Sequence, residues 1–193
     1  MTPVRGQPPV SLTKPDPLAP PGPRGAALRV AMILIAIFLS AAIFLWLLGV
    51  MPTRVAGDQN DYHLVAIRQF ARTLPDVSLR DYPSATTPGY HLLLAGVQRT
   101  TGAPTIALQA CAALFTVGLL GTFGWLLARR ARAGGEFTTL GLVAVGAPLA
   151  CSPYVLSSGV WLLPDNAAWW GVVAMLALGL CPPGSLSERP RSW

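Results

Sequence analysis

Long apolar runs without a charged residue constrain the fold of this chain more than any other feature. The longest, residues 104–128, has 25 residues and contains no Asp, Glu, Lys or Arg. A helix of that length covers roughly 38 Å at 1.5 Å per residue, more than the ~30 Å hydrocarbon core of a bilayer. Only 11% of the residues are charged, against roughly 25% in a soluble domain. The sequence therefore predicts an all-α, polytopic integral membrane protein.

Four apolar runs, three without a charged residue and the last with one acid, predict about four membrane spans. They are residues 30–51, 104–128, 137–156 and 161–181. The first run competes with a cleaved signal peptide, but the apolar core of a signal peptide is about 7–15 residues long. Its 22 charge-free residues therefore favour a retained signal-anchor. A further apolar run, residues 89–97, is too short to span and is expected to be a re-entrant or surface helix.

The distribution of positive charge sets the expected orientation. The Pro-rich leader, residues 1–29, has four cations against one acid, and a second cluster lies at residues 129–132. Both belong in the cytoplasm under the positive-inside rule. The leader, expected to be disordered, and the polar tail, residues 182–193, are then cytoplasmic. Because 13 of the 14 cations are arginine, we expect the plasma membrane of a bacterium and no nucleic-acid partner.

The outer loop, residues 52–103, is the expected place for chemistry. It contains both histidines of the chain, four acids and five arginines. A carboxylate beside the membrane can act as a general base, and arginine can pair with a phosphate group in bidentate fashion. A helix is predicted over residues 61–74, with its apolar face on the membrane surface and its arginines directed to lipid headgroups. The alternative is a solvated loop in which Asp61 caps that helix.

Asp165 stands a turn inside the last apolar run. A carboxylate in a spanning segment is costly and is a functional candidate by default, although Asp165 could instead cap the start of the helix. Asp58, Asp61 and His63 could also supply metal ligands. The chain has no HExxH or paired CxxC motif, so we expect neither a metal nor a cofactor.

Three short sequence motifs together carry a resemblance to a known family. The outer loop opens with acids at 58 and 61 and His63, residues 86–90 read Thr-Thr-Pro-Gly-Tyr, and Asp165-Asn166 opens the last run. Together they resemble the amino-terminal part of GT-C fold, polytopic glycosyltransferases. The similarity is greatest to the alpha-1,2-glucosyltransferases that finish the dolichol-linked oligosaccharide, and to their bacterial relatives, and it covers about residues 28–181.

This resemblance implies a sugar donor carried on a polyprenyl phosphate, and a sugar or lipid-linked acceptor on the non-cytoplasmic face. It implies a catalytic acid in the outer loop, a role that is carried to Asp58. Asp61 is the second candidate, because the family often has Asp-Glu where this chain has Asp58-Gln59. The residues expected to hold sugar or phosphate are His63, Arg68, Arg72, Arg80, His91, Asp165 and Asn166.

Two other functions stay open on the sequence alone. Members of the family are considerably longer and continue through further spans. A non-catalytic membrane subunit would copurify with another membrane protein and would tolerate neutralisation of the loop acids. A truncated, inactive product would have low steady-state abundance.

Overall fold

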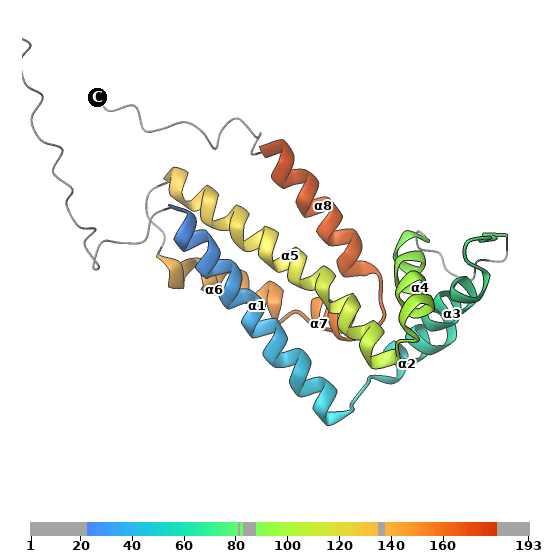
Figure 1. Ribbon diagram of the computed structural model, residues 1–193. Coiled ribbons are helices and arrows are strands. Elements are labelled where there is room, and N and C mark those ends of the chain that lie inside the picture. Colours follow the sequence, from blue (N-terminus) through green and yellow to red (C-terminus); the bar gives the residue numbers. More distant parts are fainter. Residues whose placement is uncertain (1–22, 81, 83–87, 135–137, 181–193) are drawn as a thin grey trace, which may run out of the picture.

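The computed structural model describes residues 23–80, 82, 88–134 and 138–180, and every regular element in these ranges is a helix. The predicted all-α fold is therefore confirmed (Figure 1). The elements are α1 (Pro23–Leu48), α2 (Thr53–Gly57), a π-helical turn η1 (Asp58–His63), α3 (Leu64–Thr73), α4 (Gly89–Thr101), α5 (Thr105–Gly134), α6 (Thr139–Ala150), α7 (Pro153–Val160) and α8 (Asp165–Leu180).

The structure has two to three candidate membrane spans. The segments Gly25–Leu48 in α1 and Thr105–Ala131 in α5 are long and apolar enough to cross a bilayer, and α6 with α7 adds a third if the pair is one span. With 16 residues, α8 covers about 24 Å, so the expected total of four spans is not confirmed. The first helix begins at Pro23, inside the expected leader. The rest of the leader, and the tail, lie outside the described residues.

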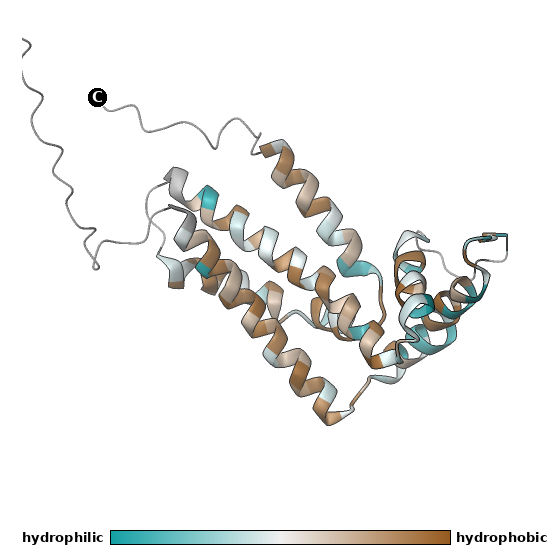
Figure 2. Cartoon of the chain, in the orientation of Figure 1, coloured by the Kyte–Doolittle hydropathy of each residue, from teal (hydrophilic) through white to brown (hydrophobic). Residues whose placement is uncertain are grey.

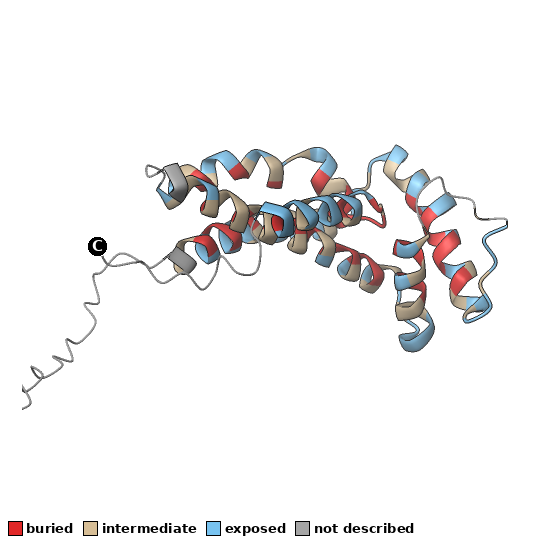
Figure 3. Ribbon diagram, turned by 90° about the horizontal axis from the view of Figure 1, so that it is seen from above, coloured by how far each residue is buried: buried red, intermediate tan, exposed pale blue. Residues whose placement is uncertain are grey.

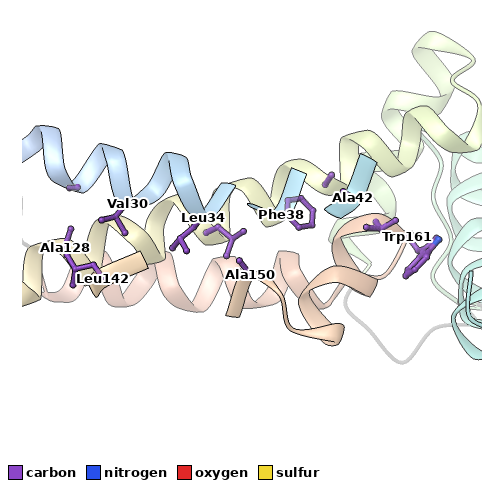
Figure 4. Close-up of a cluster of buried hydrophobic side chains, with 12 residues drawn as sticks. Val30, Leu34, Phe38, Ala42, Ala128, Leu142, Ala150 and Trp161 are labelled. Carbon is purple, nitrogen blue, oxygen red and sulfur yellow. The ribbon is translucent and has the colours of Figure 1, made fainter. Parts of the chain in front are cut away.

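The long helices pack side by side, and the outer-loop helices gather at one end of them (Figure 1). On one side, α1 packs against α5, α6 and α7, and α8 covers another side of α5. Val30, Leu34 and Phe38 of α1 are fully buried in the resulting core (Figure 4). The long helices are predominantly apolar on their outer surfaces as well (Figure 2), as expected for helices that lipid surrounds.

The predicted span at residues 137–156 is instead two helices, α6 and α7, which meet at a bend of 66°. Pro148 lies inside α6, and Pro153 is at the start of α7. Proline has no N–H to donate and is favoured at the first turn of a helix, so the second proline begins a new helix in a new direction. A sequence without charges therefore does not form one straight span here.

The outer helices form a second packed cluster. Leu64, Ile67 and Phe70 of α3 pack against Tyr90 and Leu94 of α4. The expectation that this apolar face lies on the membrane surface is therefore wrong, because α4 covers it. Buried residues accordingly line the facing sides of these helices (Figure 3).

The apolar run at 89–97 is not among the segments long and apolar enough to cross a bilayer. It lies in α4, which has 13 residues and a length of about 20 Å. Arg99 of α4 donates hydrogen bonds to the carbonyl oxygens of Ala71 and Leu74. The end of α4 is thus joined to the end of α3, and the two helices form one unit beside the bundle.

Candidate functional site

The two candidate catalytic acids, Asp58 and Asp61, lie in the π-helical turn η1. Both side chains are exposed. A single π-turn inserted between α-helical segments is rare and frequently marks a functional site. The helix continues through Asp61 from α2 into α3, so Asp61 does not cap the start of a helix. The capping alternative for this residue is wrong.

Gln59 fixes the turn to the bundle. Its side chain is 2% exposed, and its Oε1 accepts hydrogen bonds from Gln109 Nε2 of α5 at 2.8 Å and from the Leu162 backbone N–H at 3.1 Å. The family pattern drew attention to Gln59 as a missing acid, whereas the structure gives it a positioning role for the neighbouring Asp58. Gln109 was missed, although a glutamine inside a charge-free run was a usable signal.

The two histidines form a buried pair behind the acids. His63 Nδ1 and His91 Nε2 are 2.9 Å apart, and the Tyr82 hydroxyl is 2.6 Å from His91 Nδ1. His91 is fully buried, and His63 is 9% exposed. The expected direct contact of His91 with sugar or phosphate therefore does not fit its position. The pair instead connects η1 to α4.

The negative charges of two predicted acids act on this histidine pair. Burial lowers the pKa of His63, and the negative charges of Asp58 and Asp165 oppose that shift. Burial also raises the pKa of Tyr90, with a further contribution from Asp165. The Tyr90 hydroxyl is buried and has no hydrogen-bond partner within the described part of the chain. The charges of Asp58 and Asp165 thus act on the histidine pair from distant parts of the sequence.

Asp165 is the first residue of α8, and its side chain is exposed. Among the described residues its carboxylate makes no hydrogen bond, so it does not cap its helix. The neighbouring Asn166 is 2% exposed, and its Nδ2 donates to Thr116 Oγ1 at 2.6 Å and to the Val155 carbonyl at 2.8 Å. These bonds hold the start of α8 against α5 and α7 and so fix the place of Asp165.

The three predicted phosphate-binding arginines are not gathered around the acids. Arg68 and Arg72 lie on the exposed side of α3, and Arg80 is exposed in the segment that follows. Within the described ranges, none of them forms an ion pair. The Thr-Thr pair of the 86–90 string lies outside the described residues.

A groove of about 700 Å³ opens beside Asp165. Its floor is α5, one wall is the junction of α6 and α7, and the other wall is α8. The lining residues are Leu119, Phe123, Leu149, Ser152, Tyr154, Val155, Asp165, Asn166, Trp169 and Val173. The 66° bend that the sequence did not predict forms one wall of this groove.

No protein-family model, curated protein or solved structure matches this chain. In the part of the chain that the structure describes, no three metal-ligating side chains come together. The candidate site therefore consists of a buried histidine pair, the exposed acids of η1, and an apolar groove beside Asp165.

Acidification from pH 7.5 to 5.5 is expected to destabilise the protein through His63. Its pKa is lowered in the folded chain, so the unfolded chain binds more protons below about pH 6.5. This contribution to stability is complete above that pH and is lost as the pH falls toward the folded-state pKa. The slope is at most about 1.4 kcal/mol per pH unit for one proton. Thermal unfolding of the native chain and of His63→Gln, across this range, measures it.

The His63→Gln variant should show a flatter pH dependence, because glutamine has no proton to gain but can still hydrogen-bond to His91. His91, which contacts His63, the rings of Tyr82 and Tyr90 that contact His91, and the acids Asp58 and Asp165 whose charges act on His63 are present in both proteins. Equal slopes for the two proteins would contradict this assignment.

Proposed function

We propose that this chain is the amino-terminal part of a membrane glycosyltransferase. It moves a sugar from a polyprenyl-phosphate donor to an acceptor hydroxyl on the non-cytoplasmic face. The observation that carries the proposal is the position of Asp58 in η1, a turn that Gln59 fixes to α5 and to the Leu162 backbone just before α8, near the groove that opens beside Asp165. A carboxylate at the edge of a membrane-embedded groove is the arrangement needed to activate a hydroxyl next to a lipid-linked sugar.

In the proposed reaction, Asp58 accepts the proton of the acceptor hydroxyl. The hydroxyl oxygen forms a bond to the anomeric carbon, and the bond from that carbon to the phosphate oxygen breaks. The electron pair leaves with the polyprenyl phosphate. Gln59 positions Asp58 by fixing η1 to α5.

The proposal includes a topology of four crossings, with α6 and α7 together as the third and α8 as the fourth. Both termini are then in the cytoplasm and α2–α4 are on the outer face. Single cysteines placed at Thr53 and Thr138, in a chain without its native cysteines, should differ in labelling by a membrane-impermeant maleimide in intact cells. We expect labelling at Thr53 and none at Thr138. The reverse pattern, or labelling at both positions, would overturn the topology.

Replacing Asp58 by Asn should lower the rate of sugar transfer by about 10²–10⁴-fold, the usual contribution of a positioned general base. The assay uses polyprenyl-phosphate hexoses with a radiolabelled sugar, and the protein in its native membrane. Asp76→Asn is the matched control, because Asp76 is also an exposed acid of the outer segment. It should keep the native rate.

Asp61→Asn separates the two candidate acids. Asp61 lies in the same turn as Asp58, but the charges that act on His63 are those of Asp58 and Asp165. We expect Asp61→Asn to retain most of the transfer rate. The proposed function is wrong if Asp58→Asn and the Asp58→Asn, Asp61→Asn double variant both transfer sugar at the native rate.

A further inference from the structure

The groove beside Asp165 has the form of a ligand site within the apolar part of the bundle. Its volume of about 700 Å³ lies inside the range of about 300–1,000 Å³ that is typical of small-molecule sites. Along α8 it extends from Asp165 to Val173, roughly 12 Å at 1.5 Å per residue. Leu119 and Phe123 of α5 form its floor, and Trp169 lies on the α8 wall. One end is therefore polar, and the rest is suited to an apolar chain.

The polar end offers hydrogen-bond acceptors. Among the described lining residues, Asp165 alone is charged, and its carboxylate is not used in a hydrogen bond within the described ranges. The orientation of the Asn166 amide follows from its partner, because the Val155 carbonyl at 2.8 Å can only accept. Both amide hydrogens of Asn166 are therefore donated inside the protein, and its Oδ1 is the atom left to accept.

The carboxylate of Asp165 and the amide oxygen of Asn166 determine which lipid headgroup can bind at this end of the groove. A carboxylate with no cation beside it repels a phosphate group, and the Asn166 oxygen cannot donate to one. A hydroxyl group, in contrast, donates to either acceptor and carries no charge.

We infer that the groove binds a lipid with a hydroxyl headgroup and no phosphate, such as diacylglycerol, with the hydroxyl at Asp165 and one acyl chain along α8. That this lipid is the acceptor rests on the function proposed above, whereas its binding does not.

Photolabelling of the full chain in phosphatidylcholine vesicles tests this inference. The two probes are diacylglycerol and phosphatidic acid, each with the same diazirine in one acyl chain, and no sugar donor is present. We expect the diacylglycerol probe to label peptides of α5 and α8 at least fivefold more strongly than the phosphatidic acid probe. Unlabelled diacylglycerol should compete, and unlabelled polyprenyl phosphate should not.

Two neighbouring residues of α8 provide a matched pair. Val173 lines the groove, whereas Val172 is 47% exposed and is not among the lining residues. Val173→Trp should fill the groove and reduce the labelling at least fivefold, and Val172→Trp should leave it unchanged. Asp165→Lys replaces the acceptor by a cation and should reverse the preference, so that the phosphatidic acid probe labels more strongly.

Three results would overturn the inference: equal labelling of the native chain by both probes, no labelling by either, or equal effects of Val172→Trp and Val173→Trp. The last would indicate lipid at the outer surface of α8, or a groove that another helix fills. Failure of the proposed function is distinguishable, because Asp58→Asn should lower the rate of sugar transfer and leave photolabelling at the native level. Native photolabelling by a protein that transfers no sugar would support the lipid site and contradict the transferase.

Discussion

Replacing Asn166 by Asp is expected to lower the free energy of unfolding by about 3–5 kcal/mol at pH 8, the usual cost of an uncompensated buried charge. The substitution exchanges the Nδ2 donor for a carboxylate oxygen of nearly the same shape. That oxygen faces the Val155 carbonyl at 2.8 Å, and two acceptors then repel each other at a position that is 2% exposed. Thermal or detergent-induced unfolding followed by circular dichroism measures the loss.

Asn60→Asp is the matched control for this substitution. Asn60 is exposed, and its Oδ1 accepts a hydrogen bond from Gln59 Nε2 at 3.3 Å, a role that a carboxylate keeps. This variant should stay within about 0.5 kcal/mol of the native protein, as surface substitutions usually do. Asn166→Leu should fall between the two, because it removes both hydrogen bonds and buries no charge. If Asn166→Asp is as stable as Asn60→Asp, the hydrogen bonds of Asn166 do not hold α8 in place.

The long helices α1 and α5 could be predicted because the evidence for each is a single charge-free run in the sequence. A charge-free run long enough to span a bilayer has few alternatives, since every backbone N–H and C=O group must be paired inside the segment. The charge-free runs located α1 and α5, although α1 begins seven residues before its predicted start and α5 ends six residues beyond its predicted end. It did not find the break between α6 and α7, because Pro153 lies within a run that is apolar on both sides.

The amphipathic pattern of α3 was found, but the surface that it covers was not. Leu64, Ile67 and Phe70 are apolar at helical spacing, and this spacing is the same whether the helix lies on lipid or on another helix. In the structure this apolar face packs against α4, whose Tyr90 and Leu94 contact the three residues of α3. Only the long-range contact decides between the two surfaces, and a single sequence does not contain it.

For the candidate site, the sequence indicated which residues to consider, but not which of them are exposed and which are buried. It singled out Asp58, His63, His91 and Asp165, and the structure places these residues at one end of the bundle. It did not separate exposed acids from buried imidazoles, because His91 is polar in sequence and fully buried in the fold. Gln109 and Thr116 were passed over in an apolar run, although polar side chains there need buried partners.

The other large effect is expected at Phe38, where α1 meets α5 and α7. Its ring is fully buried (Figure 4), and a Cβ added at Gly159 would lie 2.7 Å from it and 2.5 Å from Thr116 Oγ1. Phe38→Ala opens a cavity and should cost about 3 kcal/mol, the lower end of the usual 3–5 kcal/mol. The lower value is expected because lipid tails are as apolar as the core, so the lost contacts dominate the cost.

Gly159→Ala alone should cost about 1–3 kcal/mol by overpacking, because both Phe38 and Thr116 are fully buried. Combined with Phe38→Ala, the new methyl group enters the space that the ring has left. The double variant should therefore be more stable than the sum of the two losses by at least about 0.5 kcal/mol, a coupling typical of residues in contact. As a control, Gly171→Ala adds a methyl group where no atom lies within 4 Å, and it should show no coupling to Phe38→Ala. Strict additivity for the Gly159 pair would mean that α7 does not pack against Phe38, and that the bend beside the groove is held by other contacts.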